Sequence, residues 1–195
     1  MKVVLMGTPD FVVPIFDAVA ARHDVVAVFT RAPKPVGRKH IITKSPVHAW
    51  AESRGLPVYH KPSEYNFTPD MVFVAAYGAI LRDNVLNSAP CVNLHPSLLP
   101  RYRGPSPIRT AIKNGDTESA VCLMKMTAEL DAGDILMCKK FNIDIDDTNE
   151  TVEEKVSKIG SEMIIEYMEN PQKFPPVPQS GKIVYTAKTG VYDEI

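Results

Sequence analysis

Short apolar runs alternate with amphipathic segments along the first half of the chain. The runs occur at Lys2–Met6, Asp24–Phe29, Met71–Ala75 and Val92–Leu94. Strands covered on both faces of a parallel sheet have continuous apolar sequences of this kind. Segments with helical spacing lie between them. This alternation predicts an α/β fold with a doubly wound, mostly parallel sheet.

Capping residues indicate where two of the intervening helices begin and end. Phe11–Arg22 has a helical pattern, and Pro14 is tolerated in its first turn. Ser45 followed by Pro46 is typical of an N-cap and a first helical residue. Gly55 is expected to close that second helix.

The pattern changes after about residue 119. Ser119–Met126 and Ile135–Phe141 are predicted to be strands joined by a turn at Ala132–Gly133. A longer helix is predicted over Asn149–Met168. The proline-rich segment Pro171–Gly181 is predicted to be a surface loop.

The composition fits a single globular domain of 195 residues. No apolar run reaches the ~18 residues that a membrane span needs, and the N-terminal run is too short for a signal peptide. We therefore expect a cytoplasmic protein that does not enter a membrane. Because the net charge is −1, any nucleic-acid contact must come from a local patch.

The three cysteines, Cys91, Cys122 and Cys138, lie far apart in apolar stretches and are predicted to be buried thiols, not metal ligands or a disulfide framework.

The densest polar cluster is Asn93-Leu94-His95-Pro96-Ser97-Leu98-Leu99-Pro100. Asn93 and His95 are two residues apart at the C-terminal end of a predicted strand, so their side chains point to the same side. That edge of a parallel sheet is where α/β folds bind ligands. An amide and an imidazole are therefore expected to face one crevice. From spacing alone, a turn-capping Asn93 and a hydrogen-bonded core His95 are about equally consistent.

Two other segments are rich in polar residues. Glu129–Asp134 could bring a carboxylate to the same crevice, although its composition by itself is that of a solvated turn. Arg31–His48 is basic, contains no acid, and is predicted to be a loop because of Pro33, Pro35 and Gly37. It is either a solvated surface or a phosphate-contacting loop. Neither a dinucleotide fingerprint nor a Walker motif occurs, so NAD and ATP are not predicted.

The cluster at residues 93–100, followed by Tyr102-Arg103-Gly104, resembles the signature of the 10-formyltetrahydrofolate-dependent formyltransferases. That resemblance implies a Rossmann-like fold and 10-formyltetrahydrofolate as co-substrate, with no metal. The family's trio of Asn, His and the Asp of a Leu-Asp-x-Gly turn falls on Asn93, His95 and Asp131, with Asp131 orienting the imidazole and favouring its charged form. The folate pocket is implied at Tyr77, Gly78, Ile80, Leu81, Ser97, Leu98, Leu99, Pro100 and Leu130.

Other segments resemble the branch of this family that acts on methionyl-initiator tRNA. They are Gly7-Thr8-Pro9-Asp10-Phe11, Pro35-x-Gly37-Arg38 and Ser45-Pro46-Val47. The basic loop of that branch reaches the acceptor end of the tRNA, which implies tRNA contacts by Lys34, Arg38, Lys39 and Lys44. This chain departs from the branch at Lys39, where a second glycine is more usual, and at Pro105-Ser106, which replaces an alanine pair.

The resemblance implies a catalytic domain over residues 1–189 and a short tail at 190–195, without the family's C-terminal β-barrel domain that helps to hold tRNA. A monomer is expected. Two other functions fit the same motifs. One is a sugar-amine N-formyltransferase, which should lack the basic loop. The other is a truncated, non-catalytic folate- or RNA-binding module, which the retention of all three catalytic residue types disfavours.

Overall fold

The computed structural model describes residues 1–37 and 39–187. These residues form two compact units, with the boundary in the chain between Asn93 and Leu94. Arg38, which the sequence assigns to tRNA binding, and the predicted tail at 190–195 lie outside the described residues.

The first unit, residues 1–93, is built on a parallel sheet. β1 (Lys2–Gly7) pairs with β2 (Asp24–Phe29) and with β6 (Met71–Ala75), and β2 also pairs with β5 (Val58–Tyr59). The three longer strands are the apolar runs that the sequence predicts. Both Val3–Met6 and Met71–Ala75 are buried throughout, as expected for strands with two covered faces.

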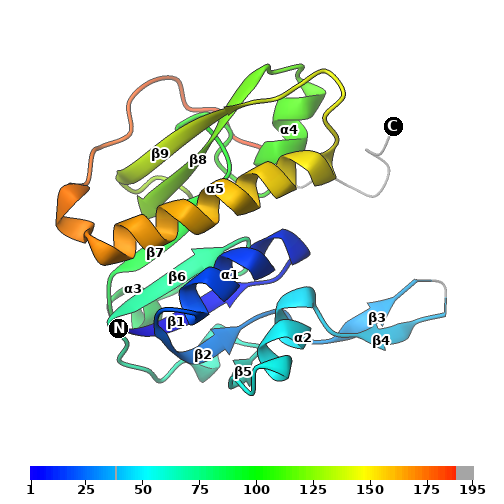
Figure 1. Ribbon diagram of the computed structural model, residues 1–195, viewed down its shortest axis with the longest axis vertical. Coiled ribbons are helices and arrows are strands. Elements are labelled where there is room, and N and C mark those ends of the chain that lie inside the picture. The colour runs from blue at the N-terminus through cyan, green and yellow to red at the C-terminus, as the bar shows by residue number, and fades with distance from the viewer. Residues whose placement is uncertain (38, 188–195) are drawn as a thin grey trace. The chain divides into compact units, whose positions relative to one another are not determined.

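Helices connect the strands of this unit (Figure 1). The predicted helix over Phe11–Arg22 is shorter than expected: η1, a 3-10 turn at Asp10–Val12, leads into α1 (Val13–Ala20). α2 (Pro46–Ser53) begins as predicted, because Ser45 Oγ accepts a hydrogen bond from the His48 amide at 3.1 Å. The unit also contains η2 (Pro62–Glu64) and α3 (Asp83–Leu86).

The basic segment predicted to be a loop is instead a β-hairpin. β3 (Lys34–Val36) and β4 (Ile41–Thr43) pair antiparallel, with Pro35 opposite Ile42. Ile41, Ile42 and Thr43 are β-branched and favour an extended backbone. Pro35 is tolerated because the ribbon has only two strands, so one edge of each strand needs no partner. The hairpin projects away from α2 (Figure 1).

The second unit begins at Leu94 and contains an antiparallel pair, β8 (Glu118–Lys125) and β9 (Ile135–Asn142). α5 (Asn149–Glu169) packs against both strands. Thr148 caps this helix by accepting a hydrogen bond from the Thr151 amide. None of the described helices is long and apolar enough to cross a membrane. The unit also contains α4 (Pro107–Lys113) and η3 (Pro171–Lys173).

The cysteine prediction is wrong for two of the three residues. Cys122 on β8 and Cys138 on β9 are directly opposite in the register and form a disulfide, with their Cα atoms 4.1 Å apart. Residues so placed on antiparallel strands are close whatever their separation in sequence. Cys91 is a buried free thiol as predicted, and burial raises its pKa to about 11.

Along the whole chain the strands are hydrogen-bonded in the order β5-β2-β1-β6-β7-β8-β9, where β7 is Cys91–His95. The predicted α/β fold with a mostly parallel sheet is confirmed. The predicted loop at Pro171–Gly181 is mainly exposed, but it is not free of the fold. Val177 exchanges two backbone hydrogen bonds with Ile135, and further on Tyr185 forms a bridge with Arg103. We call residues 177–186 the C-terminal strap.

Candidate active site

The predicted amide and imidazole both lie on β7. All five residues of this strand are buried, and Asn93 and His95 are 9% and 4% exposed. They alternate with Leu94, so the strand directs both side chains to one face. Two polar side chains this deeply buried need hydrogen-bonding or charged partners.

The imidazole of His95 is held by the loop that follows it. His95 Nε2 lies 2.8 Å from the carbonyl oxygen of Tyr102. Because a carbonyl can only accept, Nε2 carries the hydrogen. Tyr102 has a positive φ of 60°, and its hydroxyl donates to Asp116 Oδ2 at 2.7 Å. The hydroxyl of Tyr102 thus anchors the residue whose carbonyl fixes the histidine ring.

The other nitrogen of the ring faces a carboxylate. His95 Nδ1 lies 3.7 Å from Asp131 Oδ2, which is longer than a hydrogen bond but within the range of an ion pair. Asp131 Oδ2 also accepts a hydrogen bond from the Gly104 amide at 2.7 Å. A protonated imidazole would therefore present Nδ1–H beside a fixed negative charge. The structure brings His95 and Asp131 together as predicted, although 36 positions separate them in the sequence.

The folate residues predicted in the first unit follow β6. Tyr77 and Leu81 are buried, whereas Gly78 and Ile80 are exposed, Ile80 by 84%. The hydroxyl of Tyr77 has no hydrogen-bond partner among the described residues, and burial raises its pKa to about 12. A buried phenol without a partner is costly unless a ligand or water satisfies it. This loop therefore has an unused polar group and an exposed apolar side chain.

The folate residues predicted in the second unit divide into two groups. Leu99 packs with Ala120 and Met124, and the buried Ser97 donates its hydroxyl hydrogen to the carbonyl of Arg101 at 2.7 Å. The side chains of Leu99 and Ser97 are thus buried in the protein's own interior and are not available to a ligand. Leu130 is 58% exposed and remains available to a ligand. Leu98 is half-buried, and Pro100 is buried.

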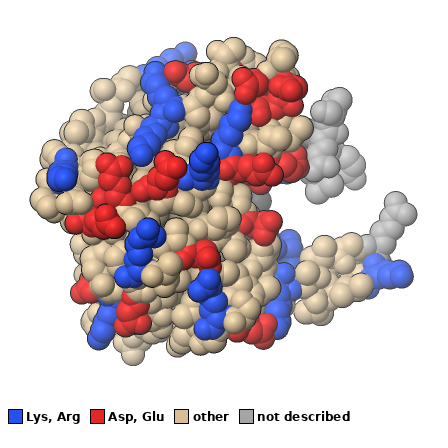
Figure 2. Space-filling view, viewed as in Figure 1, with Lys and Arg blue, Asp and Glu red and all other residues tan. Residues whose placement is uncertain are grey.

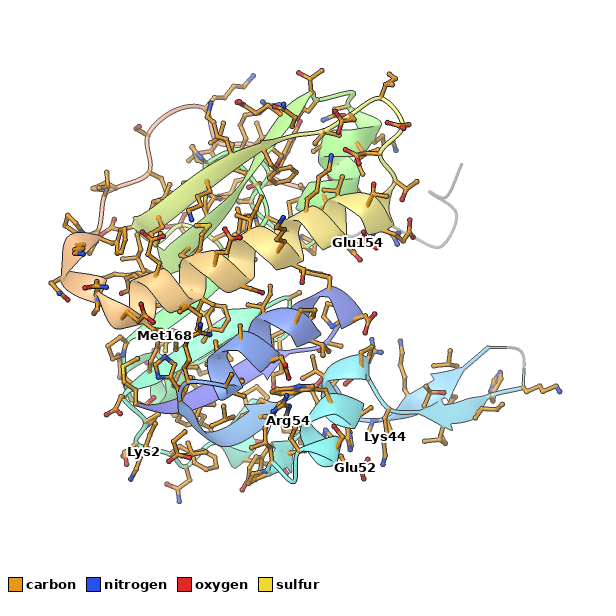
Figure 3. The ribbon with its side chains drawn as sticks, viewed as in Figure 1. Lys2, Lys44, Glu52, Arg54, Glu154 and Met168 are labelled. Atoms are coloured by element: carbon orange, nitrogen blue, oxygen red, sulfur yellow. A yellow bond between two sulfur atoms is a disulfide. The ribbon has the colours of Figure 1, made fainter. Side chains whose placement is uncertain are left out.

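The hairpin presents lysines on a fixed base. Thr30 Oγ1 and Ser45 Oγ, at the two ends of the segment, are hydrogen-bonded at 2.7 Å and are both buried. Lys44 is paired with Glu52 of α2 at 2.6 Å (Figure 3). Lys34 and Lys39 are exposed, and the charged atoms on the projecting hairpin are blue in Figure 2. Three of the four residues predicted to bind tRNA therefore lie on one arm.

Sequence reasoning did not identify the contacts of Arg103 and Gln179. The buried guanidinium of Arg103 donates to Gln179 Oε1 from Nε at 3.1 Å and from Nη2 at 2.8 Å. Gln179 in turn contacts the Asp131 turn. No motif spacing could reveal a pair that is 76 residues apart. Within residues 1–37 and 39–187, no three His, Cys, Asp or Glu side chains are grouped so as to hold a metal ion.

Comparison with known proteins identifies the family. A family model described as formyl transferase matches residues 1–168. The chain therefore belongs to the formyl transferase family. It is 40% identical over 204 residues to the methionyl-tRNA formyltransferase of Ehrlichia ruminantium (strain Gardel), an alignment that covers 96% of this chain and 67% of that protein. The chain thus spans about two thirds of that relative's length.

Solved structures show the same fold. An N-formyltransferase from Helicobacter canadensis, in complex with folinic acid and dTDP-3-aminofucose, has a TM-score of 0.76 at 21% identity and covers 95% of this chain and 70% of that one. A methionyl-tRNA formyltransferase from Clostridium thermocellum has a TM-score of 0.68 at 18% identity, with coverages of 97% and 73%. At these identities the likeness concerns the fold alone.

Proposed function

We propose that this protein transfers the formyl group of 10-formyltetrahydrofolate to the amino group of methionyl-initiator tRNA. The observation that carries the proposal is the pairing of His95 with Asp131 in a chain 40% identical to a methionyl-tRNA formyltransferase. The exposed lysines of the hairpin support tRNA over a small amine as the acceptor.

The reaction needs a hydrogen-bond donor at the formyl oxygen. As the amine nitrogen attacks, a bond to the formyl carbon forms and negative charge develops on the formyl oxygen. The bond to N10 of the folate then breaks, one proton leaves the amine and one reaches N10. Asn93 can donate from its amide, and protonated His95 can donate from Nδ1 and pass a proton on.

Asp131 acts through the histidine. Its carboxylate faces Nδ1 and is held in place by the Gly104 amide, so it fixes the orientation of the ring and places a negative charge beside Nδ1. The attacking nucleophile is the substrate's own amine, so no enzyme nucleophile is required. The Ser97 hydroxyl is in any case occupied, because it donates to the Arg101 carbonyl.

Folate is proposed to contact the loops that carry Tyr77–Leu81, Ser97–Pro100 and Leu130. The unpartnered Tyr77 hydroxyl and the exposed Ile80 and Leu130 side chains support this assignment. Ser97 and Leu99 would contribute backbone groups, because their side chains are buried in the protein. The Helicobacter canadensis relative of this fold was crystallised with folinic acid, a folate compound.

The proposal is tested by measuring the transfer of a radiolabelled formyl group from 10-formyltetrahydrofolate to an acceptor. Charged methionyl-initiator tRNA and a dTDP-amino sugar serve as alternative acceptors. We expect formylmethionyl-tRNA as the product. Formylation of the sugar alone would replace the proposal with a sugar-amine N-formyltransferase, and folate binding without transfer to either acceptor would indicate a non-catalytic module. A cytoplasmic location and a monomeric state accompany the proposal as expectations.

A further inference from the structure

The C-terminal strap lies against the loop that fixes His95. The Arg103 amide donates to the Val184 carbonyl at 2.9 Å, and the Thr186 amide donates to the Arg103 carbonyl at 2.7 Å. A Cβ at Gly104 would lie 2.9 Å from the Thr186 carbonyl oxygen, so the strap passes too close for any residue but glycine. The strap therefore packs directly on the residue whose amide binds Asp131.

One side chain of the strap connects this loop to the Asp131 turn. Gln179 Nε2 donates to the carbonyl oxygens of Asp131 at 2.9 Å and of Gly133 at 2.8 Å. Its Oε1 accepts two hydrogen bonds from Arg103. An amide side chain has two donor hydrogens and two acceptor lone pairs. All four are used, so the geometry defines the position of Gln179 completely.

The Asp131 turn needs such a restraint. Asp131 has a φ of 48°, in the left-handed region, which costs conformational energy for every residue but glycine and which aspartate enters more readily than most side chains. Backbone of this kind persists where surrounding contacts hold it, and such positions cluster at functional sites. Gln179 binds the carbonyl on each side of Ala132, which fixes the turn that aims the carboxylate. Without those two bonds the turn can relax and move Oδ2 relative to His95 Nδ1.

Gln179 also restrains the loop at Tyr102–Gly104, through its hydrogen bonds with Arg103. Arg103 lies between Tyr102, whose carbonyl binds His95 Nε2, and Gly104, whose amide binds Asp131 Oδ2. Its guanidinium is 5% exposed and also approaches Glu129 Oε1 at 3.4 Å. Gln179 thus connects the loop whose carbonyl binds His95 Nε2 with the turn whose carboxylate faces His95 Nδ1.

We infer that Gln179 is a positioning residue for formyl transfer, which sets the Asp131 carboxylate against His95 without touching substrate. The inference rests on the proposed function. It predicts that disturbing Gln179 lowers kcat and leaves substrate KM values nearly unchanged, because binding surfaces stay intact while the proton-handling pair is misaligned.

Gln179→Glu is the sharpest test. A carboxylate keeps the acceptors for Arg103 but has no hydrogen to donate to the Asp131 and Gly133 carbonyls. We expect kcat to fall roughly 10–100-fold, by analogy with the loss that follows removal of a hydrogen-bond partner that orients a metal-ligating side chain. Gln179→Asn, one methylene shorter, is the second variant and should also lose kcat because it cannot span both loops. Gln172→Glu, an exposed residue on η3, is the matched control and should behave as wild type.

A second readout does not depend on activity. The Gly104 amide proton reports on Asp131 Oδ2, and the Arg103 amide, bound to Val184, serves as the internal reference. In substrate-free protein, Gln179→Glu should shift the Gly104 resonance and speed its hydrogen exchange while leaving the Arg103 amide protected. A wild-type kcat in both folded variants, or a fall in kcat with an unchanged Gly104 amide, overturns the inference. If the wild-type protein transfers no formyl group, the proposed function is wrong. The positioning role of Gln179 is then judged by the amide readout alone, and an unchanged Gly104 amide in Gln179→Glu contradicts it.

Discussion

The Nδ1 atom of His95 lies 3.7 Å from Asp131 Oδ2, while Nε2 of the same ring is bound to the carbonyl oxygen of Tyr102. One nitrogen of the imidazole is thereby occupied, and the other faces a carboxylate. A proton that this ring gives up or takes on during a reaction is therefore carried by Nδ1.

Asp131→Asn should separate charge from geometry. Asparagine retains an oxygen that can accept the hydrogen bond from Gly104 but has no negative charge to place beside His95 Nδ1. We expect kcat to fall by about 10²–10⁴, the usual size of a general acid–base contribution, with little change in folate KM. Asp134→Asn, in the same turn, is the control. Steady-state rates near the wild-type value for Asp131→Asn would remove this residue from the catalytic role.

Asn93→Ala should remove one donor to the developing oxyanion. The expected loss is about 10²–10³ in kcat, with an unchanged melting temperature if the side chain acts on substrate alone. Asn84→Ala, an exposed asparagine of α3, provides the matched control. A variant at Asn93 that turns over at the wild-type rate would contradict the assignment.

The hairpin lysines should act on tRNA and not on folate. In a Lys34→Ala/Lys39→Ala double variant we expect a higher KM for methionyl-tRNA and an unchanged folate affinity. The dependence of log KM on log salt should become shallower by about 2, because each phosphate contact contributes a slope near 1. The control is Lys113→Ala/Lys158→Ala, which removes two exposed lysines of the second unit. Equal efficiency of hairpin variant and wild type at two salt concentrations would exclude these lysines from tRNA binding.

Asp147, which lies just before α5, should make the free energy of unfolding depend on pH. Its carboxylate accepts hydrogen bonds from Lys155, the Asp144 amide and Thr151, and these lower its pKa from 3.8 to about 2. Because the folded pKa is below the unfolded value, the stabilisation is complete above pH 4 and is lost as the pH falls towards 2.

Asp147→Asn should therefore lower the Tm by a few degrees at pH 7, and the difference from wild type should shrink between pH 4 and pH 2. Thermal melts across this range measure it. Asp146→Asn, its exposed neighbour, should track the wild type. A difference that stays constant down to pH 2 would contradict the assigned pKa.

The disulfide between Cys122 and Cys138 determines how many thiols can be alkylated. Alkylation of the unfolded, unreduced protein should label Cys91 alone, and prior reduction should expose all three cysteines. Reduction should lower the free energy of unfolding by about 3 kcal/mol, as expected for a link between residues 16 apart. Three labelled thiols without reductant would show that Cys122 and Cys138 are not joined.

Local signals in the sequence were strong enough to predict most of the secondary structure. β2 and β6 have the predicted boundaries, and α2 starts at the predicted cap, because short apolar runs and capping residues act on their immediate neighbours. The hairpin at Lys34–Thr43 was missed, since its prolines and glycine indicate a loop while the β-branched residues after them favour pairing.

The residue patterns alone predict the α/β class and a strand at Val92–Leu94 with Asn93 and His95 at its C-terminal end, and the family resemblance implies Asp131. Which atoms meet is visible in the three-dimensional structure alone: Nδ1 faces Asp131, Nε2 binds Tyr102, and Gln179 contacts both loops. Pairing of Cys122 with Cys138 was likewise decided by strand register. Such contacts join residues far apart in the chain, and their geometry depends on turn conformation and register, which no local pattern encodes.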